Sequence, residues 1–256
     1  MRLLHVMKKD FMETKHSLFI YAITIVSIVG GIVILQTAFS QRGDYSNMDQ
    51  YRSFFAGFLF LGGAIYTSLL FSDDMFNRVR AHNFLMLPAS NEEKFLSRAL
   101  FSAIIYPISI IVLFTLTSIV VELLLLVTLG DPMVLFNPFQ KDILTSLPTY
   151  FVVSSLFFLG ATYFKKTHFI KTTFTSWLII FSFVIVVVLF ARIILTPYFQ
   201  EQSFFYIRVS FFDTFERIPR IIDVISKFLY YVVLPLFFYF ISYLRIKEVQ
   251  ATDAIQ

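Results

Sequence analysis

The chain has 256 residues, of which 57% are hydrophobic and only 15% are charged, and its mean hydropathy is +0.76. A soluble domain carries about 25% charged residues, so this composition excludes an ordinary globular surface and indicates a protein of the lipid bilayer. The 34 Phe residues lie mostly in long apolar runs, which favours membrane helices over a β-barrel. A net charge of +4 suggests no nucleic-acid partner, and the absence of Cys excludes disulfides and thiolate metal sites.

Residues 1–16 predict an amphipathic helix lying at the membrane surface. Apolar side chains gather on one face of the helical wheel and cations on the other, so Lys8 and Lys9 would contact lipid phosphates. A cleaved signal peptide is the alternative, but Asp10 and Glu13 are foreign to its basic start and no small-residue cleavage site follows. The apolar face comprises Leu3, Leu4, Val6, Met7 and Phe11, opposite Lys8, Lys9, Glu13, Lys15 and His16.

Six apolar runs follow, each near the roughly 20 residues that a transmembrane helix needs. Pro107 makes the third run kinkable, and Pro235 lies inside the sixth. Together with residues 1–16, these runs predict an all-α polytopic membrane protein built as one transmembrane domain over 1–256. The predicted spans are about 17–38, 53–71, 99–127, 147–164, 172–196 and 228–244.

The polar segment 73–98 separates the second run from the third and predicts a helix, a break at proline and a new helix. Pro88 disfavours helical geometry at Leu87, so the first helix should end there. Ser90 and Glu93 form a capping-box pattern, in which each side chain accepts a hydrogen bond from the other residue's backbone amide. We expect this segment to contact a cytoplasmic partner. Helical spacing places Phe76, Val79, Arg80, Asn83, Phe84 and Leu87 on one face.

A further apolar stretch, 204–224, is too charged to cross the membrane. Each charged residue would cost roughly 3 kcal/mol at mid-bilayer, against roughly 0.5 kcal/mol gained per Phe or Ile. We therefore predict two short outer helices over 203–225, interfacial or re-entrant and broken at Pro219. The charged residues are Arg208, Asp213, Glu216, Arg217, Arg220 and Asp223.

Six spans place both termini on one side of the membrane. Cations close to the span ends are more numerous on that side, which the positive-inside rule assigns to the cytoplasm. We expect a multi-pass protein of the plasma membrane, or cell inner membrane, with both termini cytoplasmic. The cytoplasmic cations are Arg2, Lys8, Lys9, Lys15, Arg78, Arg80, Lys94, Arg98, Lys165, Lys166, Lys171, Arg245 and Lys247, against Arg42, Arg52, Lys141, Arg208, Arg217, Arg220 and Lys227 outside.

Two charged residues lie inside the predicted spans, Glu122 near the outer end of the third and Arg192 near the outer end of the fifth. A lone charge is costly in lipid, so the two are a candidate intramembrane charge pair, either as a packing salt bridge or as the lining of a substrate path. Gly57, Gly62 and Gly63 form a small-residue patch in the second span. Such a patch is compatible with close helix–helix contact.

Motifs for the common catalytic chemistries are missing from the sequence. No Gly is followed by Lys, so there is no phosphate-binding P-loop, and HExxH and GxSxG do not occur. Glu92, Glu93 and Arg98 resemble the EExxxR motif of membrane-embedded CAAX-type proteases, but the Arg falls one residue late. Only His168 lies downstream to serve as a metal ligand. A capping box with a surface ion pair is the other interpretation, and we assign no catalytic, metal or cofactor residue.

The ordered pattern resembles the permease subunit of type-2 ABC transporters, the ABC-2 family. The sequence FLMLPASNEEKFLSR, residues 84–98, is similar to the family's LxxLPxSRxEKxLxR/K-like stretch, with Asn91 where a basic residue is frequent. The ending at 243–248, YLRIKE, resembles the family's basic exit from its last span. The likeness in topology covers nearly the whole chain.

This resemblance implies an export mechanism in which two permeases, of the same or a different chain, pair around a central path. Two copies of an ATPase subunit bind beneath them and carry the ATP, so this chain needs no cofactor and is not itself an enzyme. Cargo would be lipid-like, amphipathic or peptide. A membrane-embedded hydrolase or protease, and an accessory or immunity membrane protein, are the alternatives. The resemblance assigns ATPase coupling to Arg78, Arg80, Phe84, Leu87, Pro88, Ser90, Glu92, Glu93 and Lys94, and interface contacts to Lys8 and Lys9.

Overall fold

A computed structural model describes residues 2–39, 47–76, 90–130, 133–164, 167–195 and 220–253, and all regular secondary structure in these ranges is helical. Three of the segments, labelled η, are π-helical turns inside longer helices. The segments in chain order are α1 Arg2–Phe39, α2 Asn47–Gly57, η1 Phe58–Gly62, α3 Gly63–Phe76, α5 Asn91–Leu100, η2 Phe101–Ile105, α6 Tyr106–Leu129, α7 Lys141–Tyr163, α8 His168–Leu195, α10 Arg220–Phe228, η4 Leu229–Val233 and α11 Leu234–Asp253.

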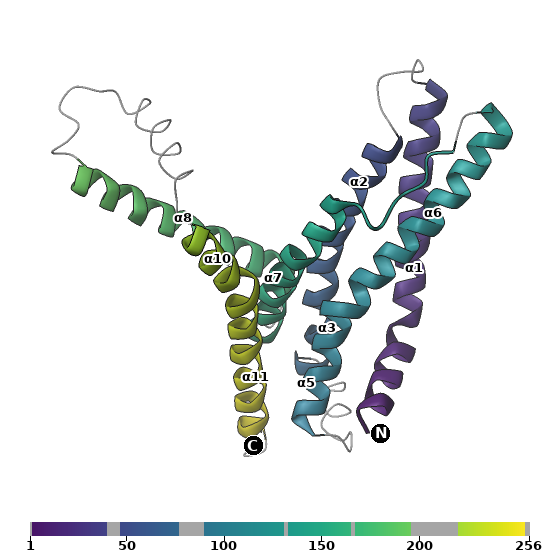
Figure 1. Ribbon diagram of the computed structural model, residues 1–256. Coiled ribbons are helices and arrows are strands. Elements are labelled where there is room, and N and C mark those ends of the chain that lie inside the picture. The colour runs from purple at the N-terminus through teal and green to yellow at the C-terminus, as the bar shows by residue number, and fades with distance from the viewer. Residues whose placement is uncertain are drawn as a thin grey trace.

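Because α2, η1 and α3 are continuous, as are α5, η2 and α6, and α10, η4 and α11, the described segments make six long helices. All six are long and apolar enough to cross a membrane, which confirms the predicted number of spans. The start of α1 and the end of α11 lie at the same end of the molecule, as six crossings require (Figure 1). We call this the terminal end and the opposite one the far end.

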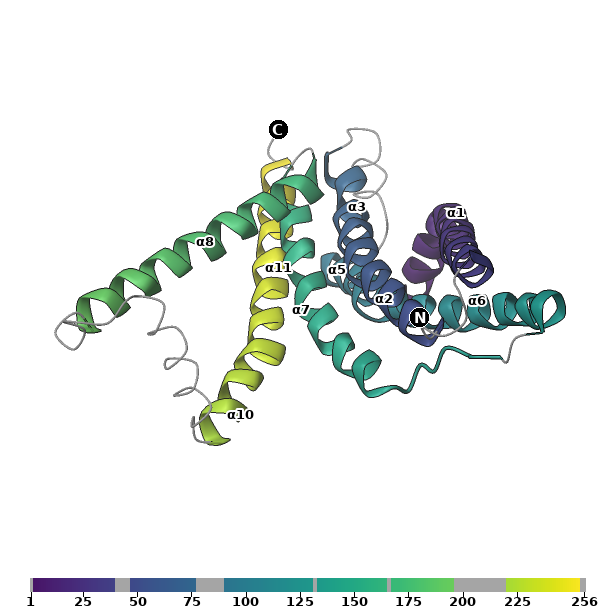
Figure 2. The ribbon, with the colours of Figure 1, turned by 90° about the horizontal axis from the view of Figure 1, so that it is seen from above.

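The helices form a splayed arrangement rather than a closed bundle. Helix α7 packs against α3 on one side and α11 on the other, while α1 packs along α5 and α6. Helix α8 leaves the group at its α7 junction and projects outward, as the view from above also shows (Figure 2). Every described side chain from Trp177 to Phe190 in α8 is exposed and almost all are apolar, which is the composition of a lipid-facing surface.

The main core lies between α1, α2, α3, α6 and α7. Phe55 of α2 packs edge-on against Phe114 of α6, and Phe136 from the α6–α7 connection lies against both rings at 5.5 Å and 5.9 Å between centroids. The edge-to-face arrangement is the one that aromatic quadrupoles favour. The aliphatic part of this core comes from Ile25, Val29, Val33, Leu59, Ile110, Val121, Leu125 and Ile143.

Two predicted surface helices differ in the structure. Residues 2–16 continue without a break into the first span as α1, because the chain has neither Pro nor Gly to end a helix before Gly30. The structure therefore has no separate surface helix there. Of the predicted outer helices, 203–219 lie outside the described residues. Residues 220–225 belong to α10, which is continuous with the sixth span rather than independent of it.

The glycine patch of the second span makes room for tyrosine rings. A Cβ atom at Gly63 would collide with Tyr150 of α7 and lie 3.0 Å from Tyr106 of α6, whereas one at Gly57 would meet nothing within 4 Å. We expect close helix–helix contact at such a patch, and in the structure Gly62 and Gly63 admit aromatic side chains from neighbouring helices.

Gly63→Ala should therefore destabilise the protein, by about 1–3 kcal/mol for an overpacked buried site. Gly57→Ala is the matched control, and it should be neutral or stabilise by about 0.5–1 kcal/mol because alanine is the better helix former. Thermal unfolding in detergent would compare the two. Equal melting temperatures for both variants would contradict this packing.

Candidate functional site

The third span begins with the capping box that the sequence predicts. Ser90 precedes the first turn of α5, its hydroxyl accepts from the Glu93 amide at 3.2 Å, and the Glu93 carboxylate accepts from the Ser90 amide at 3.0 Å. Both contacts satisfy amide groups that a helix start leaves without partners. The helix that follows runs unbroken into η2 and α6, so its capped start lies at the terminal end (Figure 1) and its body is long and apolar enough to cross a membrane.

Side chains of α5 connect it to three other spans. Tyr243 of α11 donates a hydrogen bond to the Glu92 carboxylate at 3.3 Å. The Phe95 ring packs edge-on against Phe158 of α7 at 5.4 Å and against Tyr243 at 5.5 Å. The Arg98 guanidinium, almost fully buried, donates to the Leu70 carbonyl of α3. A displacement of α5 would therefore be transmitted to α3, α7 and α11.

Only some of the residues predicted for ATPase coupling and interface contacts belong to the described part of the chain. Lys94 is buried on the side where α1 packs along α5, Lys9 of α1 is partly buried near it, and Lys8 is exposed. A buried lysine at a membrane end keeps its charged group toward the surface while its methylene stem packs. The other predicted coupling residues lie outside the described residues; they are Arg78, Arg80, Phe84, Leu87 and Pro88.

The candidate intramembrane charge pair is not brought together. Glu122 is buried on α6, where it accepts from the Tyr51 hydroxyl at 3.2 Å and from the Val134 amide at 3.1 Å. Arg192 is exposed near the end of α8, which projects to the opposite side of the molecule in both views (Figures 1 and 2). Glu122 is therefore buried, with a hydroxyl and a backbone amide among its partners.

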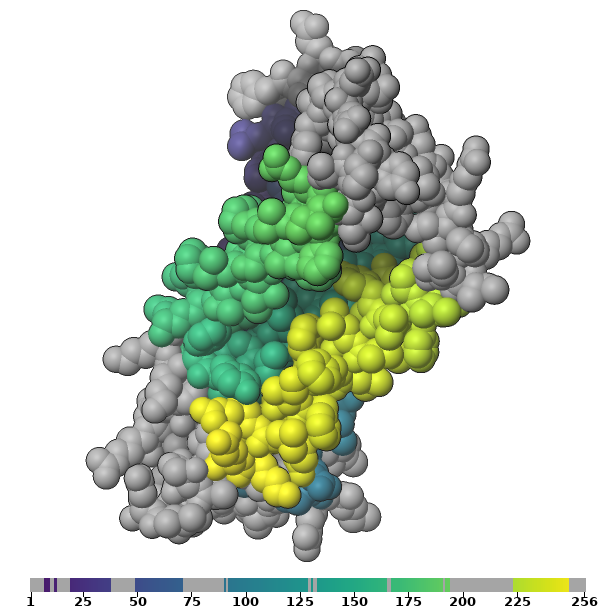
Figure 3. All heavy atoms as spheres, turned by 90° about the vertical axis from the view of Figure 1, so that its left-hand side faces the viewer, coloured from purple at the N-terminus to yellow at the C-terminus, as the bar shows by residue number. Residues whose placement is uncertain are grey.

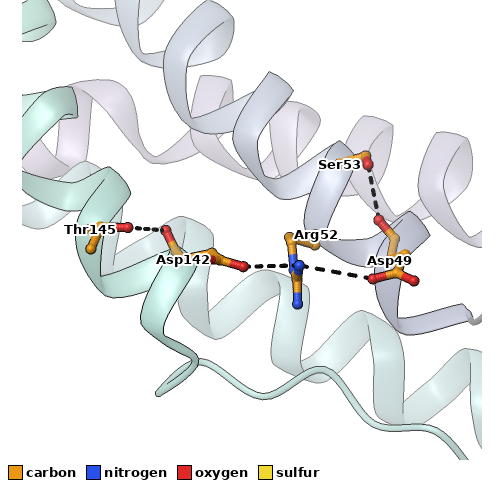
Figure 4. Close-up of polar contacts among 5 residues, drawn as sticks. All are labelled: Asp49, Arg52, Ser53, Asp142 and Thr145. Carbon is orange, nitrogen blue, oxygen red and sulfur yellow. Dashed lines mark hydrogen bonds and ion pairs between the residues drawn. The ribbon is translucent and has the colours of Figure 1, made fainter. Parts of the chain in front are cut away.

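Glu122 helps to hold the α6–α7 connection against the far end of the molecule. The Val134 amide reaches its carboxylate, and two residues later the Phe136 amide donates to the Ser118 hydroxyl at 3.3 Å. These bonds place the Phe136 ring in the aromatic core. An ion pair closes the same end, because Arg52 of α2 lies 2.9 Å from Asp142 in the first turn of α7 and 3.9 Å from Asp49 (Figure 4).

A group of tyrosines at the centre of the molecule was not singled out by the sequence. The hydroxyls of Tyr21 and Tyr106 lie 2.9 Å apart, and Tyr106 also donates to the Phe58 carbonyl at 2.8 Å. Tyr150 donates to the Ser102 carbonyl at 2.6 Å. Both carbonyls belong to π-helical turns, so the tyrosines bind backbone at the two irregular points of the second and third spans.

The residues proposed for hydrolase chemistry have structural roles. Glu93 is engaged in the capping box and Glu92 accepts from Tyr243, while His168 is buried at the start of α8. Within the described part of the chain, no three His, Asp or Glu side chains gather as a metal site would require.

Comparison of the chain with protein-family models, with curated proteins and with solved structures found no match.

Replacing Glu122 should loosen the α6–α7 connection. Glu122→Leu removes the acceptor of the Val134 amide and of the Tyr51 hydroxyl, so amide exchange over 133–136 should rise about tenfold or more, as for the loss of a buried charged acceptor. Asp142→Asn, which weakens only the exposed ion pair, should change that exchange little. Hydrogen–deuterium exchange measures both, and equal effects of the two variants would contradict the role given to Glu122.

Proposed function

We propose that this chain is the membrane subunit of an ATP-driven exporter similar to the ABC-2 permeases. The observation that carries the proposal is the construction of α5. Its start is capped, it is continuous with the third span, and it contacts α3, α7 and α11 through Arg98, Phe95 and Glu92. A capped helix end resists fraying, so a force applied near Ser90 would reach several spans at once. This is what a motor bound at the terminal end requires.

In this proposal the motor is a separate chain. Two ATPase subunits bind at the cytoplasmic side, which is the terminal end, and hold the ATP, so this chain hydrolyses nothing itself. Contacts would come from the segment 77–89 together with Ser90, Glu92 and the cations of α1. The hydrolase alternative has less support, because the Glu93 carboxylate already accepts the Ser90 amide.

A second permease, of the same or a different chain, completes the translocation path in this proposal. The face made by α8 and by α10 to α11 supports a contact with either a permease or lipid, because its side chains are largely exposed and apolar. Figure 3 shows this face, with α8 in green beside the yellow α10 to α11. Cargo would be lipid-like, amphipathic or a peptide, and the complex would lie in the plasma membrane with both chain ends cytoplasmic.

The direct test is purification of the tagged chain from its native membrane in mild detergent. We expect a second chain that carries the motif GxxxxGK[ST] to co-purify. The complex should contain as many copies of that chain as of permease subunits. The complex should hydrolyse ATP, and the membrane subunit alone should not. A membrane subunit that purifies without any such chain, and whose native membranes contain none that cross-links to it, would contradict the proposal.

Removing the cap should weaken coupling without dissolving the complex. Ser90→Ala costs roughly 1 kcal/mol at a helix start, and the stimulation of ATPase activity by the membrane subunit should fall several-fold while the ATPase remains bound. Ser53→Ala makes the same substitution near the far end, where the Ser53 hydroxyl donates to the Asp49 carbonyl of its own helix. It should leave stimulation unchanged. An equal effect of both variants would mean that the cap does not carry the force.

A further inference from the structure

The third span contains a point at which its own backbone cannot complete its hydrogen bonds. In η2 the Tyr106 amide donates to the Phe101 carbonyl, five residues back, which is the π-helical pattern. The next bond of that pattern would join residue 107 to the Ser102 carbonyl. Residue 107 is a proline and has no N–H group. The Ser102 carbonyl is thus deprived of its main-chain donor in the interior of a membrane protein.

The Tyr150 hydroxyl supplies the missing donor. It lies 2.6 Å from the Ser102 carbonyl oxygen, and both residues are fully buried. A buried carbonyl without a partner costs about 1–3 kcal/mol in proteins. This bond from α7 therefore stabilises the π form of η2.

In a regular α-helix the missing donor would fall at a different residue. The Tyr106 amide would then bond to Ser102, four residues back, and Pro107 would leave the Ala103 carbonyl without a donor. The Ser102 carbonyl would then already accept from the Tyr106 amide, and it would depend less on the Tyr150 hydroxyl. Pro107 thus removes the donor of the Ser102 carbonyl in the π form and of the Ala103 carbonyl in the α form, and the Tyr150 hydroxyl at Ser102 favours the π form.

The sixth span repeats the spacing of proline and π-helical turn. In η4 the Leu234 amide donates to the Leu229 carbonyl, five residues back, and Pro235 follows directly. In η2 the order is the same, with Tyr106 and then Pro107 after the turn. In both spans a proline stands two residues after the π-helical turn, whereas η1 is followed by Gly63 and Ala64.

Tyr106 connects the second span to the π-helical turn η2 of the third span. Its hydroxyl donates to the Phe58 carbonyl at the start of η1, and its ring is stacked between Tyr66 and Tyr150 at 5.1 Å and 5.8 Å. Gly63 leaves room for the two stacked rings of Tyr106 and Tyr150. Any turn of the backbone at residue 106 would therefore also disturb the acceptor at Phe58.

We propose that Tyr150 is a positioning residue that latches the register of the third span. While its hydroxyl holds the Ser102 carbonyl, η2 stays π-helical; when that bond opens, η2 becomes α-helical. The change turns α5 relative to α6 by about 100°, one residue of helical rotation, and so redirects the terminal-end side chains Lys94 and Arg98. This latch follows from the contacts between the spans alone and is independent of the export function proposed above.

A double-mutant cycle between the hydroxyl and the proline tests the latch. Tyr150→Phe removes the hydroxyl and keeps the ring, and it should lower the melting temperature of the full chain in detergent by about 3 °C, the shift expected for one lost buried hydrogen bond in a chain of this size. Pro107→Ala restores a backbone donor at residue 107, so in that background Tyr150→Phe should have almost no effect. Tyr21→Phe is the control, because the Tyr21 hydroxyl bonds to Tyr106 and not to Ser102; its effect should be the same with or without Pro107.

The helical register of the third span can be measured as the distance between two labels placed on either side of η2. The chain has no Cys, so Leu96→Cys in α5 and Leu116→Cys in α6, both exposed, give two unique sites for spin labels. Tyr150→Phe should move the distance between the labels by several ångströms, and Tyr21→Phe should not. Should Tyr150→Phe alone fail to accumulate, the double variant with Pro107→Ala should restore it, which also supports the latch. An unchanged label distance, an undiminished Tyr150→Phe effect beside Pro107→Ala, or failure of the double variant to accumulate would overturn the proposal.

Discussion

The hydrogen bond from Tyr150 to the Ser102 carbonyl illustrates the constraint on which this fold depends. Inside a bilayer no water is present to complete a backbone group, so each carbonyl must find its donor within the protein. Pro107 removes one donor from the third span, and a side chain from α7 replaces it at 2.6 Å. The packing of α7 against the third span is thereby fixed at one height, because the hydroxyl must meet one particular oxygen.

The same need explains the buried polar groups at the two ends of the molecule. At the far end, Glu122 accepts the Val134 amide of a connection that would otherwise bring unpaired backbone against the core. At the terminal end, the capping box satisfies the first amides of α5, and the Arg98 guanidinium donates to the Leu70 carbonyl of α3. Polar side chains thus define where the connecting segments and the neighbouring spans meet, while the apolar contacts supply most of the area.

How much of the fold and of the candidate site the sequence predicts depends on how far apart in the sequence the interacting residues lie. The six spans rest on runs of apolar residues, and the capping box on two residues three positions apart, so both could be predicted from local sequence. The continuity of residues 2–39 could not be predicted, because amphipathicity suggests a surface location without specifying where a helix ends. The hydrogen bonds of Tyr106 and Tyr150 to backbone carbonyls join residues 48 positions apart, and no local pattern encodes them. Pro107 predicts from the sequence alone that the third span can kink, but its partner in α7 cannot be inferred without the packing.

The length of the third helix has a consequence for its surroundings. Its membrane-compatible part, Glu92–Thr128, has 37 residues, which at 1.5 Å each is about 55 Å, whereas the hydrocarbon core of a bilayer is about 30 Å thick. Such a rod must lean, protrude, or locally thicken the lipid around it, at a small cost per ångström of mismatch. A change in lipid chain length would therefore alter the inclination of this helix and shift the height of its capped start above the headgroups.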